Sequence, residues 1–345
     1  MFPREYRGVA GAVLLFLLIQ LGSLALVQTF FDQGYQAVEN PDDPTNSFLY
    51  IGAILLATLG FLAAFKYDLD WIVRVVIVAT SGLLAWYVFS AILPSTLAVA
   101  LGAAVAVALW VYPEWYVVDT AGVLMGAGAA GLFGITFGIL PALVLLAVLA
   151  VYDAISVYKT EHMLDLADGV LDLRIPAVLV IPLSLSYSLL DDEGDDHVAT
   201  ADDEATTSEV TADEFDETQV DDETEDDSET GDDSEPDAGN ETDDRRDVFF
   251  IGLGDAVIPG VLIASAAFFS PAAQLTVPLI ELNLPALLAM VGTLGGLLVL
   301  MRMVMKGRAH AGLPLLNGGA ISGYILGSLL AGIPLLGALG LTGVL

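Results

Sequence analysis

The chain is poor in several residues on which many soluble proteins depend. Its 345 residues include no cysteine, so it forms no disulfide bond and its redox compartment cannot be judged from thiols. Its three histidines, His162, His197 and His310, are isolated in the sequence, and we expect neither a metal site nor a cofactor. Lysine and arginine number only 11 against 44 acidic residues, which argues against a nucleic-acid partner.

Apolar residues are abundant instead. They make up 56% of the chain, with a mean hydropathy of +0.72, which is more than one soluble core can bury. We therefore predict an all-α polytopic membrane protein, whose first apolar run is too long for a removable signal peptide. At about 20 residues per crossing, the hydropathy predicts nine transmembrane helices. They cover residues 8–30, 48–65, 71–93, 96–112, 119–137, 139–158, 248–269, 284–305 and 313–341.

The few basic residues predict the orientation of these spans. Cytoplasmic loops collect lysine and arginine, whereas translocated loops avoid them. With the N-terminus inside, all 11 basic residues fall on the cytoplasmic side, and the C-terminus lies outside the cell membrane. The set consists of Arg4, Arg7, Lys66, Arg74, Lys159, Arg174, Arg245, Arg246, Arg302, Lys306 and Arg308.

A long cytoplasmic loop, residues 159–247, separates a six-helix region, residues 1–158, from a three-helix region, residues 248–345. Within it, residues 174–182 form a short apolar run that begins and ends near prolines, and we expect an interfacial or extended segment. Residues 191–247 hold most of the acids and almost no apolar side chains, so we expect disorder. This acidity explains the net charge of -33 and is typical of a halophilic archaeon.

Two aspartates lie inside hydrophobic stretches. A carboxylate at bilayer depth costs several kcal/mol unless it is compensated, so Asp153 and Asp255 indicate a function. They fall at similar depth on antiparallel spans that follow each other in sequence, where two close carboxyls would share a proton and titrate as a pair. One could activate a water while the other acts as a general acid. The alternative is a proton- or cation-coupled transporter, or a leak channel, that uses the same carboxylates as relay sites.

The residues around both aspartates resemble a known family. Tyr152-Asp153 and Gly252-Leu253-Gly254-Asp255 are similar to the YD and GxGD signatures of the presenilin and signal peptide peptidase superfamily of intramembrane aspartyl proteases, in the order that the family has. Pro314-Leu315-Leu316 stands where the family has Pro-Ala-Leu, with Leu315 in place of the alanine. An archaeal presenilin-like homologue with nine spans would fit this pattern.

The resemblance implies an intramembrane endopeptidase that cleaves transmembrane segments of other proteins in the lipid bilayer, with Asp153 and Asp255 as its catalytic pair. It also implies that substrate adds as a strand to the segment before the seventh span, close to Val248 and Phe249. The residues that would shape the site or bind substrate are Tyr152, Gly252, Leu253, Gly254, Pro314, Leu315 and Leu316.

Other features suggest structural roles. The proline of the third motif is expected to free a backbone carbonyl, with an ordinary kinked helix as the alternative. Asp119 and Glu281 lie at predicted span ends, where a charge costs little. Small residues recur every four positions along the fifth span and predict close helix packing. These are Gly122, Gly126, Ala130, Gly134 and Gly138.

Overall fold

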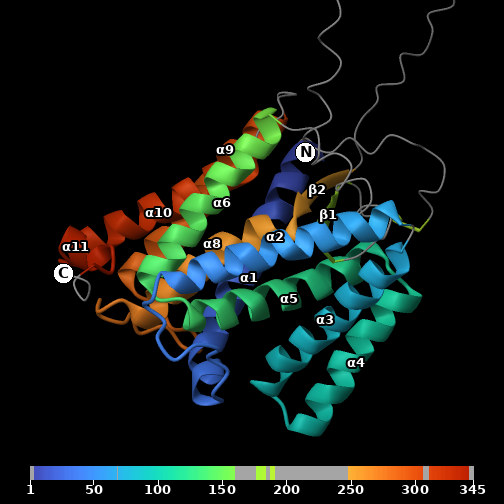
Figure 1. Ribbon diagram of the computed structural model, residues 1–345, viewed down its shortest axis with the longest axis horizontal. Coiled ribbons are helices and arrows are strands. Elements are labelled where there is room, and N and C mark those ends of the chain that lie inside the picture. The colour runs from blue at the N-terminus through green and yellow to red at the C-terminus, as the bar shows by residue number, and fades with distance from the viewer. Residues whose placement is uncertain are drawn as a thin grey trace, which may run out of the picture.

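The computed structural model describes residues 4–67, 69–159, 176–183, 187–190, 248–305 and 311–341. The acidic segment 191–247, which we expect to be disordered, and the three histidines lie outside the described residues. Figure 1 shows a bundle of long helices with a small sheet near one end. The elements are α1 (Arg4–Asp32), α2 (Thr45–Lys66), α3 (Asp70–Ser90), α4 (Ser95–Val111), α5 (Trp115–Thr136), α6 (Ile139–Lys159), β1 (Val178–Pro182), β2 (Val248–Gly252), α8 (Leu253–Phe269), α9 (Leu284–Val304), α10 (Gly312–Leu330) and α11 (Leu335–Ala338).

Each predicted span corresponds to a helix, but the helices differ in length. Within the described residues, seven helices are long and apolar enough to cross a membrane: α1, α2, α3, α5, α6, α9 and α10. Helices α4 and α8 are also apolar but have 17 residues each. At about 1.5 Å per residue, they are a few ångströms shorter than a hydrocarbon core of about 30 Å. The structure therefore establishes a multispan helical protein.

Two predicted spans are not continuous helices. The predicted span 248–269 begins with β2, because its Val-Phe-Phe-Ile run favours extended backbone and finds a strand partner. The predicted span 313–341 is broken after Leu330 by a turn in which Gly332 has a φ of +82°. The short helix α11 then follows Pro334. The expectation of an all-α protein was thus wrong at the sheet, although helices dominate the fold.

The sheet contains two antiparallel strands. Val180 of β1 pairs with Phe250 of β2, and Pro182 pairs with Val248. Residues 178–182 lie in the apolar run for which we expected an interfacial or extended segment, and they are extended. One face of the sheet packs on α1 through Phe16 and Ile19, while the other packs on α5 through Val118 and Ala121. The sheet is therefore built into the helical bundle.

The small residues of α5 allow the close packing that their spacing predicts. A Cβ atom on Gly126 would lie 3.1 Å from Ile19 of α1, and one on Gly260 of α8 would lie 3.1 Å from Ala130. Gly134 lies directly against Ala264 of α8. Since α8 begins with the Gly252–Asp255 motif region, this packing helps to determine where that motif lies.

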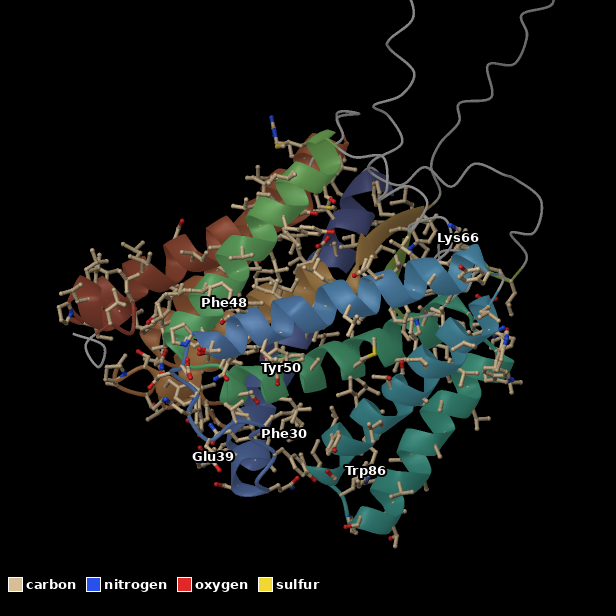
Figure 2. All side chains as sticks on the ribbon, viewed as in Figure 1. Phe30, Glu39, Phe48, Tyr50, Lys66 and Trp86 are labelled. Carbon is tan, nitrogen blue, oxygen red and sulfur yellow. The ribbon has the colours of Figure 1, made fainter. Side chains whose placement is uncertain are left out.

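Helix α2 is held mainly at its first turns. Ser47 donates a hydrogen bond to the carbonyl of Pro141 at 2.7 Å, and the ring of Tyr50 lies 4.7 Å from that of Phe137. Figure 2 shows Phe48 and Tyr50 toward one end of α2 and Lys66 at the other. Ser47 is the only buried residue of this helix.

Candidate active site

Asp153 lies in the last two turns of α6, on the side that faces the bundle. Its side chain is only 8% exposed, whereas the neighbouring Tyr152 is 46% exposed and points outward. The backbone N–H of Leu313, at the start of α10, donates a hydrogen bond of 3.1 Å to Asp153 Oδ2. A buried carboxylate of α6 is therefore joined directly to the first turn of α10.

Asp255 lies in the first turn of α8, where a negative charge is favoured by the partial positive charge of the helix N-terminus. Its side chain is half-buried. A Cβ atom on Gly312 would lie 3.2 Å from Asp255 Oδ2, so the carboxylate of Asp255 lies against the backbone of α10. Any side chain at position 312 would crowd this carboxylate.

The two carboxylates thus meet at the same place, the first two residues of α10. Asp153 accepts from the amide of Leu313, and Asp255 lies beside Gly312. The first amides of a helix have no partner within the helix, and they stabilise negative charge. Asp153 of α6 and Asp255 of α8 form an acidic pair at the start of α10, within an apolar bundle. Asp153 and Leu313 are 160 positions apart in the chain.

The residues around Asp255 divide into exposed and buried members. Gly252 and Gly254 are exposed, and neither would meet backbone if it carried a Cβ atom. Leu253 is 5% exposed, and its Cδ1 would lie 3.2 Å from a Cβ atom on Gly126 of α5. Leu253 therefore anchors the motif to α5, while the two glycines leave its backbone open.

The third motif forms the first turn of α10. Pro314 is the third residue of this helix, where the missing N–H removes no helical hydrogen bond. Pro314 therefore stands at the start of α10 and does not interrupt the helix. The carbonyl of Leu315 packs against Gly296 of α9, and Leu316 is wholly buried in the cluster that contains Leu300. The motif fixes α10 against α9 and so positions Gly312 and Leu313.

Two polar residues near the site were not identified from the sequence. Asp119 of α5, which we expected at a span end where a charge costs little, is only 7% exposed and accepts a hydrogen bond of 2.8 Å from Val180 N–H. Asn317 is wholly buried one turn after Leu313, and its Nδ2 donates to the carbonyl of Leu146 on α6 at 3.0 Å. For both, the signal available in the sequence was a single polar residue among the small and apolar residues of a helix.

No group of three or more His, Asp or Glu side chains in the described ranges could hold a metal ion. The acidic pair therefore has no third acidic or imidazole ligand among these residues.

Comparisons with known proteins found a matching family model and similar solved structures. The family model described as signal-peptide peptidase, presenilin aspartyl protease matches residues 13–333. A crystal structure of a presenilin family intramembrane aspartate protease in space group C222 is similar to the chain at 29% sequence identity and a TM-score of 0.60, covering 93% of this chain and 99% of its own. One in space group P2 is similar at 28% identity and a TM-score of 0.57, covering 93% and 97%. A search of curated proteins found no match.

Proposed function

Because the chain belongs to the signal-peptide peptidase and presenilin aspartyl protease family, it is an intramembrane aspartyl protease acting on transmembrane substrates, and we propose that Asp153 and Asp255 are its catalytic pair. The observation that carries this assignment is the meeting of both carboxylates at the first two residues of α10. The comparisons give no support to the alternative of a transporter or channel.

The proposed mechanism divides acid and base roles between the two carboxyls. In the resting pair one carboxyl is protonated and the other is ionised, because two close negative charges repel each other. The ionised carboxylate removes a proton from a water as that water attacks the scissile carbonyl carbon. The protonated carboxyl donates its proton to the carbonyl oxygen, which gives a tetrahedral diol. Proton transfer to the leaving nitrogen then breaks the C–N bond.

Strand β2 is the proposed docking edge for substrate. The amide of Leu253 donates to the carbonyl of Ala177 at 2.8 Å, and this bond determines which residue pairs of the two strands are hydrogen-bonded. The N–H groups of Phe250 and Gly252 then point away from β1, since pairs alternate in an antiparallel ladder. Neither amide has a hydrogen-bond partner among the described residues. An unwound substrate segment adding there would run beside Val248 and Phe249 and lead directly toward Asp255.

The proposed topology has nine crossings, with α4 and α8 included as shorter spans. The N-terminus and the acidic loop are cytoplasmic, and the C-terminus is outside. Contacts within one end of the bundle support this arrangement, because Arg74 near the start of α3 donates to the carbonyl of Trp110 near the end of α4 at 3.2 Å. Lys66 and Arg302 lie in the last turns of α2 and α9. Water would reach the acidic pair from the cytoplasmic side.

The catalytic assignment can be tested with purified protein in proteoliposomes and a single-span reporter. Asp153→Asn and Asp255→Asn each keep the shape of the side chain but remove its titrating group, so each should abolish cleavage. Asp32→Asn is the matched control and should cleave normally, because Asp32 is an exposed carboxylate at the C-terminal end of α1. Cleavage by either of the first two variants at the wild-type rate would refute the pair.

A further inference from the structure

Asp119 has an environment that simple placement at a span end does not explain. Its side chain is only 7% exposed within α5. Among the described residues, the one hydrogen bond to its carboxylate comes from the N–H of Val180, at 2.8 Å. Burying a carboxylate is unfavourable unless strong hydrogen bonds compensate, and this hydrogen bond also ties α5 to β1.

The contact closes one edge of the two-stranded sheet. Val180 stands opposite Phe250 in a pair that does not exchange ladder hydrogen bonds, because bonded and non-bonded pairs alternate and the pair three positions earlier, Ala177 and Leu253, does exchange one. The N–H of Val180 therefore points away from β2, toward α5. Asp119 occupies the position that an additional strand on the β1 side would need. The free edge of a sheet otherwise accepts any extended chain.

The same face of α5 also supports the catalytic motif. A Cβ atom on Gly122, one turn after Asp119, would lie 3.0 Å from Leu179 of β1 and 3.9 Å from Leu253. One turn further, a Cβ atom on Gly126 would lie 3.2 Å from Leu253. Asp119 thus holds β1 on the helix face that also positions the residue two before Asp255.

We propose that Asp119 is a positioning residue for proteolysis. It closes the outer edge of β1 and anchors the sheet to α5, so that substrate adds as a strand to β2 alone, in line with Asp255. This inference rests on the proposed docking of substrate at β2. Asp119 touches neither substrate nor the reacting atoms, and its effect is on how firmly the substrate strand is bound.

Two substitutions at this position separate the hydrogen bond from the volume of the side chain. Asp119→Asn keeps an oxygen that accepts from Val180 N–H, whereas Asp119→Leu fills similar space without an acceptor. For cleavage of a single-span reporter, Asp119→Leu should raise KM about tenfold while kcat changes less than about threefold. Asp119→Asn should stay within about twofold of wild type in both constants. Thr120→Val, the exposed neighbour on α5, is the matched control.

The opposite results would overturn the proposal. These are an unchanged KM in Asp119→Leu, a loss confined to kcat, or equal losses in the Asn and Leu variants. If Asp119→Leu does not fold, Val180→Pro removes the donor instead. Proline is tolerated where the N–H points out of the ladder, so the β1–β2 bonds remain. The same rise in KM is expected from Val180→Pro, and an unchanged KM there would refute the role of the contact.

A crosslinking experiment separates failure of this inference from failure of the proposed function. The chain has no cysteine, so Val248→Cys introduces a single thiol beside the open edge of β2. In an Asp255→Asn background, a reporter carrying one cysteine should form a disulfide with it on mild oxidation. Loss of the crosslink when Asp119→Leu is added supports the inference, and an undiminished crosslink refutes it. A crosslink absent even with Asp119 intact would instead refute docking at β2.

Discussion

The helices of the α9–α10 hairpin and helix α2 are all long and apolar enough to cross a membrane, yet they pack in opposite ways. Gly292 of α9 and Gly319 of α10 bring the two backbones into direct contact, so that a Cβ atom on either would meet the carbonyl of the other. Helix α2 buries only Ser47, and Leu56 is 72% exposed. Figure 1 shows α9 and α10 lying together, with α2 running across the bundle.

Apolar content decides whether a helix enters the membrane. Small residues that face each other on two helices decide whether those helices pack tightly there. Lipid is as apolar as leucine, so burial of leucine against protein contributes little within a bilayer. Close backbone approach and interhelical hydrogen bonds do contribute. The tightly packed hairpin carries the N-terminus of α10, where Asp153 and Asp255 meet. A site that needs fixed geometry is therefore built on the part of the bundle that packs most closely.

The largest expected effect comes from breaking the glycine contact of the hairpin. In Gly319→Leu the new side chain collides with the backbone of α9 at Gly292. Overpacking of this kind costs about 1–3 kcal/mol or more. We expect loss of a monodisperse protein in detergent, or a fall in the melting temperature by many degrees together with loss of cleavage. Size-exclusion chromatography and thermal unfolding measure this.

The adjacent glycine provides the control. Nothing lies within 4 Å of a Cβ atom on Gly318, and this residue is exposed. Gly318→Leu should fold and cleave as wild type does. If both variants behave alike, the register of the glycines is not what holds the hairpin together.

The next effect should come from Asn317, which ties α10 to α6. Asn317→Leu removes the hydrogen bond to the carbonyl of Leu146, at a cost of about 0.5–1.5 kcal/mol. Because Asp153 lies two turns further along α6, we expect kcat to fall about tenfold as the acidic pair loosens. Ser322→Ala, an exposed hydroxyl on the same helix, is the control. A normal kcat in Asn317→Leu would show that the contact with α9 positions α10 by itself.

A smaller effect is expected at the anchored end of α2. Ser47→Ala removes the hydrogen bond to the carbonyl of Pro141 and should lower the stability of the protein by about 1 kcal/mol. Leu56→Ala, on the exposed part of the same helix, should change it by less than about 0.5 kcal/mol. Thermal unfolding in the same detergent compares the two. Equal destabilisation by both would mean that α2 packs along its whole length.

The smallest effect should be a pH dependence at Glu114, just before α5. Burial raises the pKa of its carboxyl, but hydrogen bonds from Ser188, Leu189 and Trp115 outweigh this and hold the pKa below its usual value of 4.5. A lowered folded-state pKa contributes stability above the unfolded pKa, and this stability is lost as the pH falls through the folded pKa. The wild type should therefore lose stability below about pH 4.5 more steeply than Glu114→Gln. Parallel stability curves in acid would contradict the contribution of Glu114.

The sequence pointed to the two carboxylates of the candidate site but not to the contacts around them. Asp153 and Asp255 stood out because a charge inside an apolar run is rare, and that signal is local. Pro314 falls in the first turn of α10, as the predicted start of that span at residue 313 implies, so it does not interrupt the helix. Asp119 was overlooked because its partner, Val180, is 61 residues away. Hydropathy could not reveal a hydrogen bond between a helix and a distant strand.

The sequence by itself determined that this is a multispan membrane protein with two carboxylates in apolar segments and the motifs of an aspartyl protease. These properties follow from composition and from patterns a few residues long. Only the tertiary structure decided that the carboxylates meet at Gly312 and Leu313, that β2 precedes α8, and that Asp119 closes one edge of the sheet. Each depends on contacts between residues far apart in the chain, which form only when the helices pack.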